Sequence, residues 1–152
     1  MKNARRHLAG ALLALALMSG PALAALGGRA GSVDADRQQM HASALRSSTG
    51  GTYAVHEYTL DSGTVVREYA QSGTVFAVSW EGPVLPNLQQ LLGPDHFTTF
   101  TAAARSRGRS GGPLVLQQSG LVLRSTGHMR AFAGQAYLPG QLPQGVSIDD
   151  IR

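Results

Sequence analysis

The stretch that decides the fold is residues 53–83, YAVHEYTLDSGTVVREYAQSGTVFAVSWEGP. It contains the tetrapeptide Ser-Gly-Thr-Val twice, at residues 62–65 and 72–75, and polar and apolar residues alternate around both copies. Alternation of this kind predicts half-buried strands, and Ser-Gly is typical of the turns that join them. We therefore predict a three-stranded antiparallel meander.

Charge pairing indicates the register of the first hairpin. A turn of two residues would place Glu57 opposite Glu68, and like charges directly opposite each other are destabilising. A turn of three residues, Asp61-Ser62-Gly63, instead places Glu57 opposite Arg67 and His56 opposite Glu68. It also puts a glycine where a left-handed backbone is needed. We therefore predict the three-residue turn.

Applying the same turn at residues 71–73 predicts the second hairpin, with Glu68 opposite Phe76 and Val66 opposite Val78. One face of the meander then carries the bulkier side chains and is expected to meet the core. Its predicted members are His56, Tyr58, Leu60, Val66, Glu68, Phe76, Val78 and Trp80.

The remaining chain predicts helices and a further hairpin. Apolar spacing and capping residues predict helices over residues 32–45, 86–92 and 96–105, with a loop over residues 46–51. Apolar runs at 114–116 and 121–123 flank a turn, and residues 129–137 add another strand. Residues after 138 are expected to be coil. These elements predict an α+β domain with an antiparallel sheet of five to six strands and helices packed on one face.

The first 24 residues have the pattern of a cleavable signal peptide. A basic start is followed by about 11 apolar residues and by Ala22-Leu23-Ala24, which has the small residues that a signal peptidase recognises. The apolar run is shorter than the roughly 20 residues that span a membrane comfortably. We expect cleavage near Ala24, a single domain over residues 25–152 with a flexible lead-in and a coil tail, and a periplasmic or secreted location.

Removing this segment changes the charge balance. The chain has 13 Lys and Arg, nine Asp and Glu and no cysteine. Three of the basic residues, Lys2, Arg5 and Arg6, lie in the segment that is removed. The remainder has ten arginines, no lysine and nine acidic residues, which gives a net charge of about +1. Such a small charge argues against a nucleic-acid partner. The absence of cysteine excludes disulfides and thiolate metal sites.

Two short motifs match known catalytic or metal-binding patterns, but the predicted structure around them rules both out. Residues 108–112 have the letters of the G-x-S-x-G nucleophile elbow, but a strand must precede that motif and a helix must follow it, whereas Pro113 and a strand follow here. His56-Glu57 begins like the zinc motif H-E-x-x-H, but the fifth residue is Leu60 and the segment is a strand. We therefore predict no catalytic serine there, no metal and no cofactor.

Four residues remain as candidate binding residues. His56 and Glu68 face each other on the apolar face, where a carboxylate could orient a histidine for general-base chemistry, although a structural ion pair is the simpler interpretation. His128 and Arg130 lie beside Gly127 and could hold an anion, although a solvated hairpin end is the simpler interpretation. Arg105, Arg107 and Arg109 could contact anionic lipid, but a soluble loop is the stronger interpretation.

Several segments also resemble a known family. Residues 63–69 (GTVVREY), 73–83 (GTVFAVSWEGP), 85–93 (LPNLQQLLG), 127–134 (GHMRAFAG) and the ending 142–152 are similar to a family of exported bacterial proteins, domain of unknown function 2844. The resemblance covers residues 25–152. It implies an envelope or secreted location and a single domain, and it implies no activity.

The sequence therefore favours a protein that is not an enzyme and that acts by binding a protein or small-molecule partner in the cell envelope. The alternative is a small envelope hydrolase that uses His56 and Glu68 with a nucleophile or metal that the sequence does not identify. A third hypothesis is peripheral attachment to anionic membranes through the arginine-rich loop.

Overall fold

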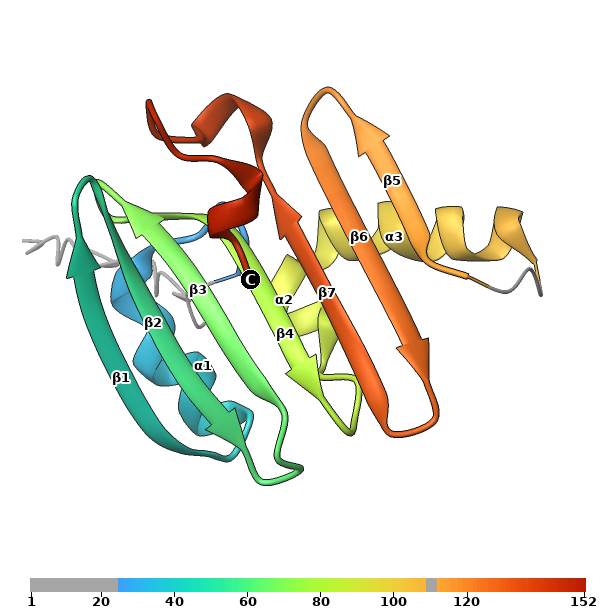
Figure 1. Ribbon diagram of the computed structural model, residues 1–152, viewed down its shortest axis with the longest axis horizontal. Helices are drawn as coiled ribbons and strands as arrows, with labels where there is room; N and C mark the ends of the chain where they lie inside the picture. Colours follow the sequence, from blue (N-terminus) through green and yellow to red (C-terminus); the bar gives the residue numbers. More distant parts are fainter. Residues whose placement is uncertain (1–24, 109–111) are drawn as a thin grey trace, which may run out of the picture.

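The computed structural model describes residues 25–108 and 112–152, and these residues form one seven-stranded antiparallel sheet with three α-helices (Figure 1). The strand order is β1-β2-β3-β4-β7-β6-β5. The strands are β1 Ala42–Gly50, β2 Tyr53–Leu60, β3 Val65–Gln71, β4 Thr74–Gly82, β5 Leu114–Gln118, β6 Leu121–His128 and β7 Ala131–Tyr137. The α-helices are α1 Val33–Gln39, α2 Leu88–Leu92 and α3 Pro94–Arg107. Short 3-10 helices are η1 Ala30–Ser32, η2 Pro139–Gln141 and η3 Ile148–Asp150.

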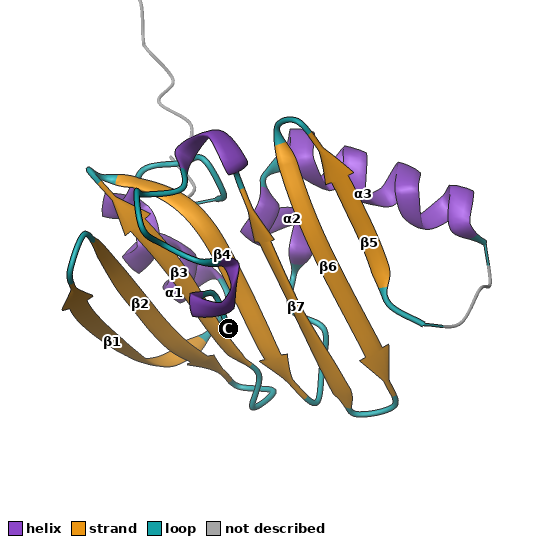
Figure 2. Cartoon of the chain, turned by 45° about the horizontal axis from the view of Figure 1, so that its top comes forward, coloured by secondary structure: helices purple, strands orange, loops and turns teal. Residues whose placement is uncertain are grey.

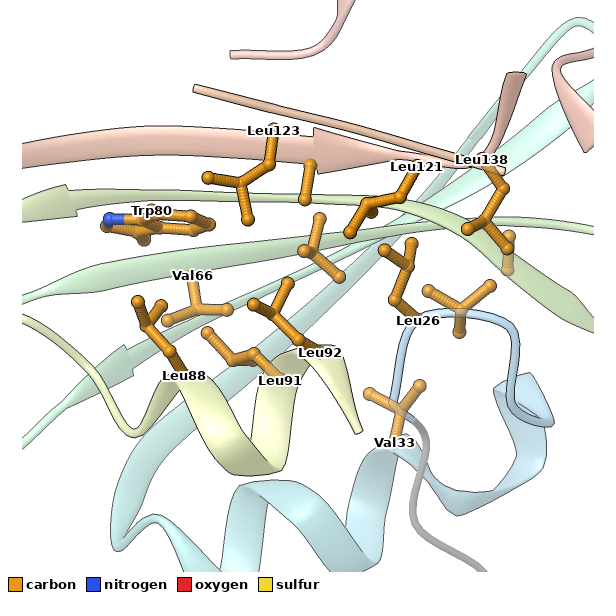
Figure 3. Packing of buried hydrophobic residues seen from close by; sticks show 14 of the residues in the cluster. Leu26, Val33, Val66, Trp80, Leu88, Leu91, Leu92, Leu121, Leu123 and Leu138 are labelled. Atoms are coloured by element: carbon orange, nitrogen blue, oxygen red, sulfur yellow. The ribbon is translucent and has the colours of Figure 1, made fainter. Parts of the chain in front are cut away.

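The two faces of the sheet are covered differently. The α-helices lie on one face, called here the helix face, and residues 139–152 cross the other, called the open face (Figures 1 and 2). The main core cluster joins buried side chains of the helix face to those of the helices (Figure 3). A second, smaller cluster on the open face contains Tyr69, Phe76, Ala77, Tyr137 and Ile151.

The first hairpin has the predicted register. His56 pairs with Glu68 and Glu57 pairs with Arg67, and Gly63 adopts a φ of +84° in the three-residue turn. An ion pair of 2.7 Å joins Arg67 Nε to Glu57 Oε2. Favourable cross-strand charges and a glycine in left-handed conformation are therefore the features that set this register.

The predicted register of the second hairpin is wrong. Glu68 pairs with Val78 rather than Phe76, and Val66 pairs with Trp80 rather than Val78. The turn has two residues, Ser72-Gly73, and the register shifts between Tyr69 and Ala70. Because of this shift, Phe76 is an extra residue in β4 without a partner in β3. Such a bulge interrupts the regular alternation of side chains between the two faces. Phe76 therefore packs on the open face, while Val78 and Trp80 stay on the helix face.

The count of five to six strands is also wrong, because the predicted helix over 32–45 ends early. His41 has a φ of +53°, and β1 begins directly after it. β1 pairs with β2 and lies at the edge of the sheet, so it includes residues 46–50, which were predicted to be a loop. Its Ser-rich sequence has little hydrophobic alternation, and its strand conformation depends on pairing with β2. The coarser prediction of an α+β fold with an antiparallel sheet is confirmed.

The lead-in and the later elements are more ordered than the sequence suggested. Residues 25–28, expected to be a flexible lead-in, are held by hydrogen bonds from Leu26 N to Leu91 O and between Gly28 O and Val75 N. Leu26 is buried in the main core cluster (Figure 3). In the predicted coil after residue 138, two 3-10 helices form, and the second is capped by Ser147.

Candidate functional site

The open face carries a cavity of about 500 Å³ between the strands β4, β7 and β6 and the C-terminal residues. Ser79, Arg124 and Gln135 contribute to its lining from the strands, and Asp149 and Arg152 contribute from the C-terminal residues. We call residues 139–152 the C-terminal strap and this hollow the strap cavity. Its volume lies within the range of about 300–1,000 Å³ that is usual for small-molecule sites.

A cross-strand row of polar residues runs through the strap cavity. Arg124 pairs with Gln135, and Gln135 pairs with Ser79 on the next strand. Ser79 pairs in turn with Arg67, which pairs with Glu57. Residues that pair directly across neighbouring strands present their side chains to the same face. The fold thus assembles one polar row from five strands.

Within this row, the three residues nearest the cavity keep most of their hydrogen-bonding capacity. Among residues 25–108 and 112–152, the Arg124 guanidinium and the Gln135 amide form no hydrogen bond or ion pair. Ser79 is only 2% exposed, and its Oγ lies 3.5 Å from the Tyr69 hydroxyl, which is the outer limit of a hydrogen bond. The cavity therefore offers a guanidinium, an amide and a buried hydroxyl to a ligand.

The strap is anchored at its end. Ile151 is 1% exposed and packs in the open-face cluster. The Tyr69 hydroxyl donates to the main-chain oxygen of Arg152 at 2.8 Å and accepts from Arg152 N at 3.0 Å. Arg67 Nη1 donates to the same oxygen at 3.1 Å. These contacts fix the wall of the strap cavity that the strands do not provide.

A second hollow, of about 440 Å³, lies beside the hairpin between β6 and β7. It is lined partly by His128 and Arg130, so the structure brings these two predicted residues together. Arg130 has a φ of +62°, an unusual conformation for a residue with a side chain, and its neighbour Met129 is 96% exposed. We call this the hairpin cavity. It shares Glu81, Thr126 and Ala133 with the strap cavity.

His56 and Glu68 lie on the opposite face, and neither lines the strap cavity or the hairpin cavity. His56 is half-buried, and its Nδ1 lies 2.8 Å from Ser47 Oγ on the edge strand β1. Glu68 is fully buried, and its Oε1 accepts a hydrogen bond of 2.6 Å from the Tyr58 hydroxyl. The two residues pair across β2 and β3, but each has a different side-chain hydrogen-bond partner.

The arginine-rich segment is described only in part. Arg105 and Arg107 lie in the last turn of α3, and Arg107 Nη2 donates to Gly112 O at 2.7 Å. Arg109 and the serine of the G-x-S-x-G match lie outside the described residues, as does the predicted signal peptide. No helix in residues 25–108 and 112–152 combines the length and apolar character needed to cross a membrane. In the same residues, no group of three His, Asp or Glu side chains is placed to hold a metal ion.

Sequence reasoning missed the strap cavity because its lining comes from three strands and the strap. The sequence did contain one signal. In residues 121–126, LVLRST, Arg124 and Thr126 are two positions apart, so in a strand they share one face. Only the pairing of β6 with β7, and of β7 with β4, places Gln135 and Ser79 beside Arg124.

Comparison with known proteins gives one match. A family model described as a protein of unknown function, DUF2844, matches residues 22–151. No curated protein and no solved structure has significant similarity to this chain. Because the family model covers most of the chain, including every strand of the sheet and all but the last residue of the strap, the protein belongs to the DUF2844 family.

Proposed function

We propose that this protein is an exported binding protein without catalytic activity, and that it holds its ligand in the strap cavity. The observation that carries the proposal is the row Arg124, Gln135 and Ser79, whose polar groups face a cavity of ligand size and are little used by the described residues. Convergent polar groups in such a cavity are the usual mark of a binding site. The near-neutral charge of residues 25–152 argues against nucleic acid as the ligand.

Export is part of this proposal and rests on the sequence of residues 1–24. Mass spectrometry of the protein recovered from the periplasm and the medium of an expressing bacterium should give a mature form that begins at Ala25. Full-length protein that stays in the cytoplasm would contradict it. The partner is then a protein or small molecule outside the cytoplasm. Attachment to membranes through Arg105, Arg107 and Arg109 is the less favoured alternative, and failure to sediment with anionic vesicles at low salt would reject it.

Ligand-observed NMR with a library of small polar molecules tests the binding site. Ala133 lines the cavity from β7, so Ala133→Phe should fill it and abolish binding while leaving the sheet intact. The matched control is Ala102→Phe, because Ala102 is exposed on α3 and does not line the cavity. His56→Ala should leave binding unchanged. Binders that persist in Ala133→Phe, or a library without any binder, would overturn the proposal.

A second candidate is a serine hydrolase, and the 2.8 Å contact between Ser47 Oγ and His56 Nδ1 favours it. In this scheme Ser47 Oγ attacks an ester carbonyl, His56 takes the hydroxyl proton and returns it to the leaving alcohol, and water then hydrolyses the acyl-serine. Glu68 is the cross-strand neighbour of His56 and is the acidic residue paired with the base. The contact is also what an ordinary cross-strand hydrogen bond would give, so this candidate ranks second.

Labelling with a fluorophosphonate, followed by peptide mass spectrometry, tests the hydrolase. The candidate requires modification of Ser47 that is lost in His56→Ala. Ser48→Ala is the matched control, because Ser48 pairs with Val55 and faces the open face of the same strand. No label on Ser47, or equal labelling of Ser47 and Ser48, would reject the candidate.

A further inference from the structure

The lining of the strap cavity also bears on what kind of ligand it takes. On the basis of the proposed binding function, we infer that the ligand carries a carboxylate and that Arg124 is the group that binds it. Arg124 has no ion-pair partner in the described part of the chain, although it lies in a row that contains a second arginine. The other arginine, Arg67, is already neutralised by Glu57 at 2.7 Å.

The neighbours of Arg124 supply the donors that a carboxylate needs. A guanidinium binds a carboxylate through two parallel N–H groups, and a neighbouring amide can donate to the same oxygens. Gln135 is the direct cross-strand partner of Arg124, and Ser79 is the partner of Gln135. Since neighbouring strands lie about 4.8 Å apart, the three side chains span roughly 10 Å. The carboxylate binds at the Arg124 end, and Ser79 meets a polar group farther along the ligand.

The other charges of the cavity argue against a phosphate and against a cation as the ligand. Glu81 and Asp149 line the same cavity, and neither lies within 4.0 Å of an arginine nitrogen. A doubly charged phosphate would meet these two acids with only two arginines, Arg124 and Arg152, to balance its charge. A cationic ligand would be repelled by Arg124 and Arg152, which line the same cavity. A singly charged carboxylate needs only the one arginine that the row leaves free.

Two probes that differ only in charge test this inference. Acetylglycine has a carboxylate, and acetylglycinamide replaces it by a neutral amide of the same size. In titrations of the ¹⁵N-labelled protein, acetylglycine should shift the backbone amide signals of Ser79, Arg124 and Gln135. Acetylglycinamide should bind at least about tenfold more weakly, since a hydrogen bond to a charged group contributes about 1.5–3 kcal/mol.

The variants separate a specific contact from general charge. Arg124→Gln should weaken acetylglycine binding about tenfold and leave acetylglycinamide binding unchanged. Arg46→Gln is the matched control, because Arg46 is exposed on the same face of the sheet and pairs with Glu57 far from the cavity. It should change neither affinity. An equal effect of the two variants would overturn the inference, because it would show that the overall positive charge, and not a direct contact with Arg124, attracts the carboxylate.

The remaining outcomes decide between the inference and the function on which it rests. Equal affinity for the two probes, tighter binding of inorganic phosphate than of acetylglycine, or no shift of the cavity signals with acetylglycine would each overturn the carboxylate assignment. If neutral molecules from the library still bind and are lost in Ala133→Phe, the binding function stands without it. If no molecule binds the cavity in either experiment, both the carboxylate assignment and the binding function are wrong.

Discussion

Glu68 is fully buried on β3, which lies between the strands β2 and β4. Burying an ionisable group costs free energy unless hydrogen bonds compensate for the lost water. The Tyr58 hydroxyl supplies one such bond at 2.6 Å. The sequence favours a structural role for Glu68 over a general-base role, and in the fold its side chain is held by this hydrogen bond.

We expect Tyr58→Phe to destabilise the protein by about 1–3 kcal/mol, because it removes a hydrogen bond to a buried carboxyl oxygen while keeping the aromatic ring. Urea denaturation followed by circular dichroism measures the change. Tyr53→Phe is the matched control, since Tyr53 is half-buried and packs its ring edge-to-face on Phe76 at 5.8 Å. Its hydroxyl has no hydrogen bond in the described residues, so its loss should change stability by less than about 0.5 kcal/mol. Equal effects of the two variants would contradict this account.

Gly134 lies so close to the Trp80 ring and to the backbone of β6 that a larger residue would not fit. A Cβ at this position would overlap the Trp80 ring and lie 2.7 Å from the main-chain oxygen of Arg124. Gly134→Ala should therefore destabilise the protein by about 1–3 kcal/mol, the usual cost of overpacking. A thermal melt should show a Tm lower by several degrees. Gly140→Ala, where a Cβ would meet nothing within 4 Å, should leave the Tm nearly unchanged.

At the scale of the elements, the repeated Ser-Gly-Thr-Val sequence forms two different turns. The first copy lies in a three-residue turn in which only Gly63 has a positive φ. In the second copy, Ser72 and Gly73 both have positive φ, at +51° and +80°. The difference follows from contacts outside the hairpin. Arg29 forms a bridge with Thr74, and Ala30 N donates to Gly73 O, so the N-terminal residues hold the start of β4.

The second turn leads to a prediction about Ser72. Two positive φ angles in a two-residue hairpin loop are typical of a type I′ turn, in which Asn-Gly is the preferred pair. Ser72→Asn should stabilise the protein by about 0.5–1 kcal/mol, because asparagine tolerates the left-handed region better than serine does. Urea denaturation measures the gain. Ser62→Asn in the first turn should give none, because Ser62 does not have a positive φ. A gain at both positions would show that turn conformation is not the cause.

At the scale of the whole molecule, the two faces of the sheet differ in how firmly they are covered. The helix face is covered by helices that share a large core with the sheet. Among the described residues, the strap alone covers the open face, and it ends in Ile151 and in the hydrogen bonds between Arg152 and Tyr69. Regions with few buried contacts open at a lower free energy than the global unfolding. The strap is therefore expected to be the first covering element to open.

Ile151→Ala should detach the strap without unfolding the sheet. Truncating a buried isoleucine costs about 2–5 kcal/mol when the surroundings cannot collapse, and this loss should exceed what the remaining strap contacts supply. Limited proteolysis should then cut within residues 139–150, while the Tm of the sheet changes little. Ile148→Ala is the matched control, because Ile148 is 43% exposed. Similar cleavage of the two variants, or loss of the whole fold in Ile151→Ala, would contradict this expectation.

How much could be predicted depends on the range of the interactions. The hairpin of β2 and β3 could be predicted down to the Glu57–Arg67 ion pair, because the charges that set its register lie within about ten residues of each other. β1 could not, because an edge strand of serine and threonine becomes a strand only through its pairing with β2. Of the four candidate residues, His128 and Arg130 do line a cavity, whereas His56 and Glu68 lie on the opposite face.

The sequence by itself determined the meander, the antiparallel α+β class, the first register and the family. These follow from local alternation, turn residues and charge pairs, which act between residues close together along the chain. Only the tertiary structure decided that Phe76 faces the open side, that β7 lies between β4 and β6, and that the strap and Arg124 line one cavity. Those outcomes depend on contacts between distant segments, whose free energy is shared among many residues and leaves no local pattern in the sequence.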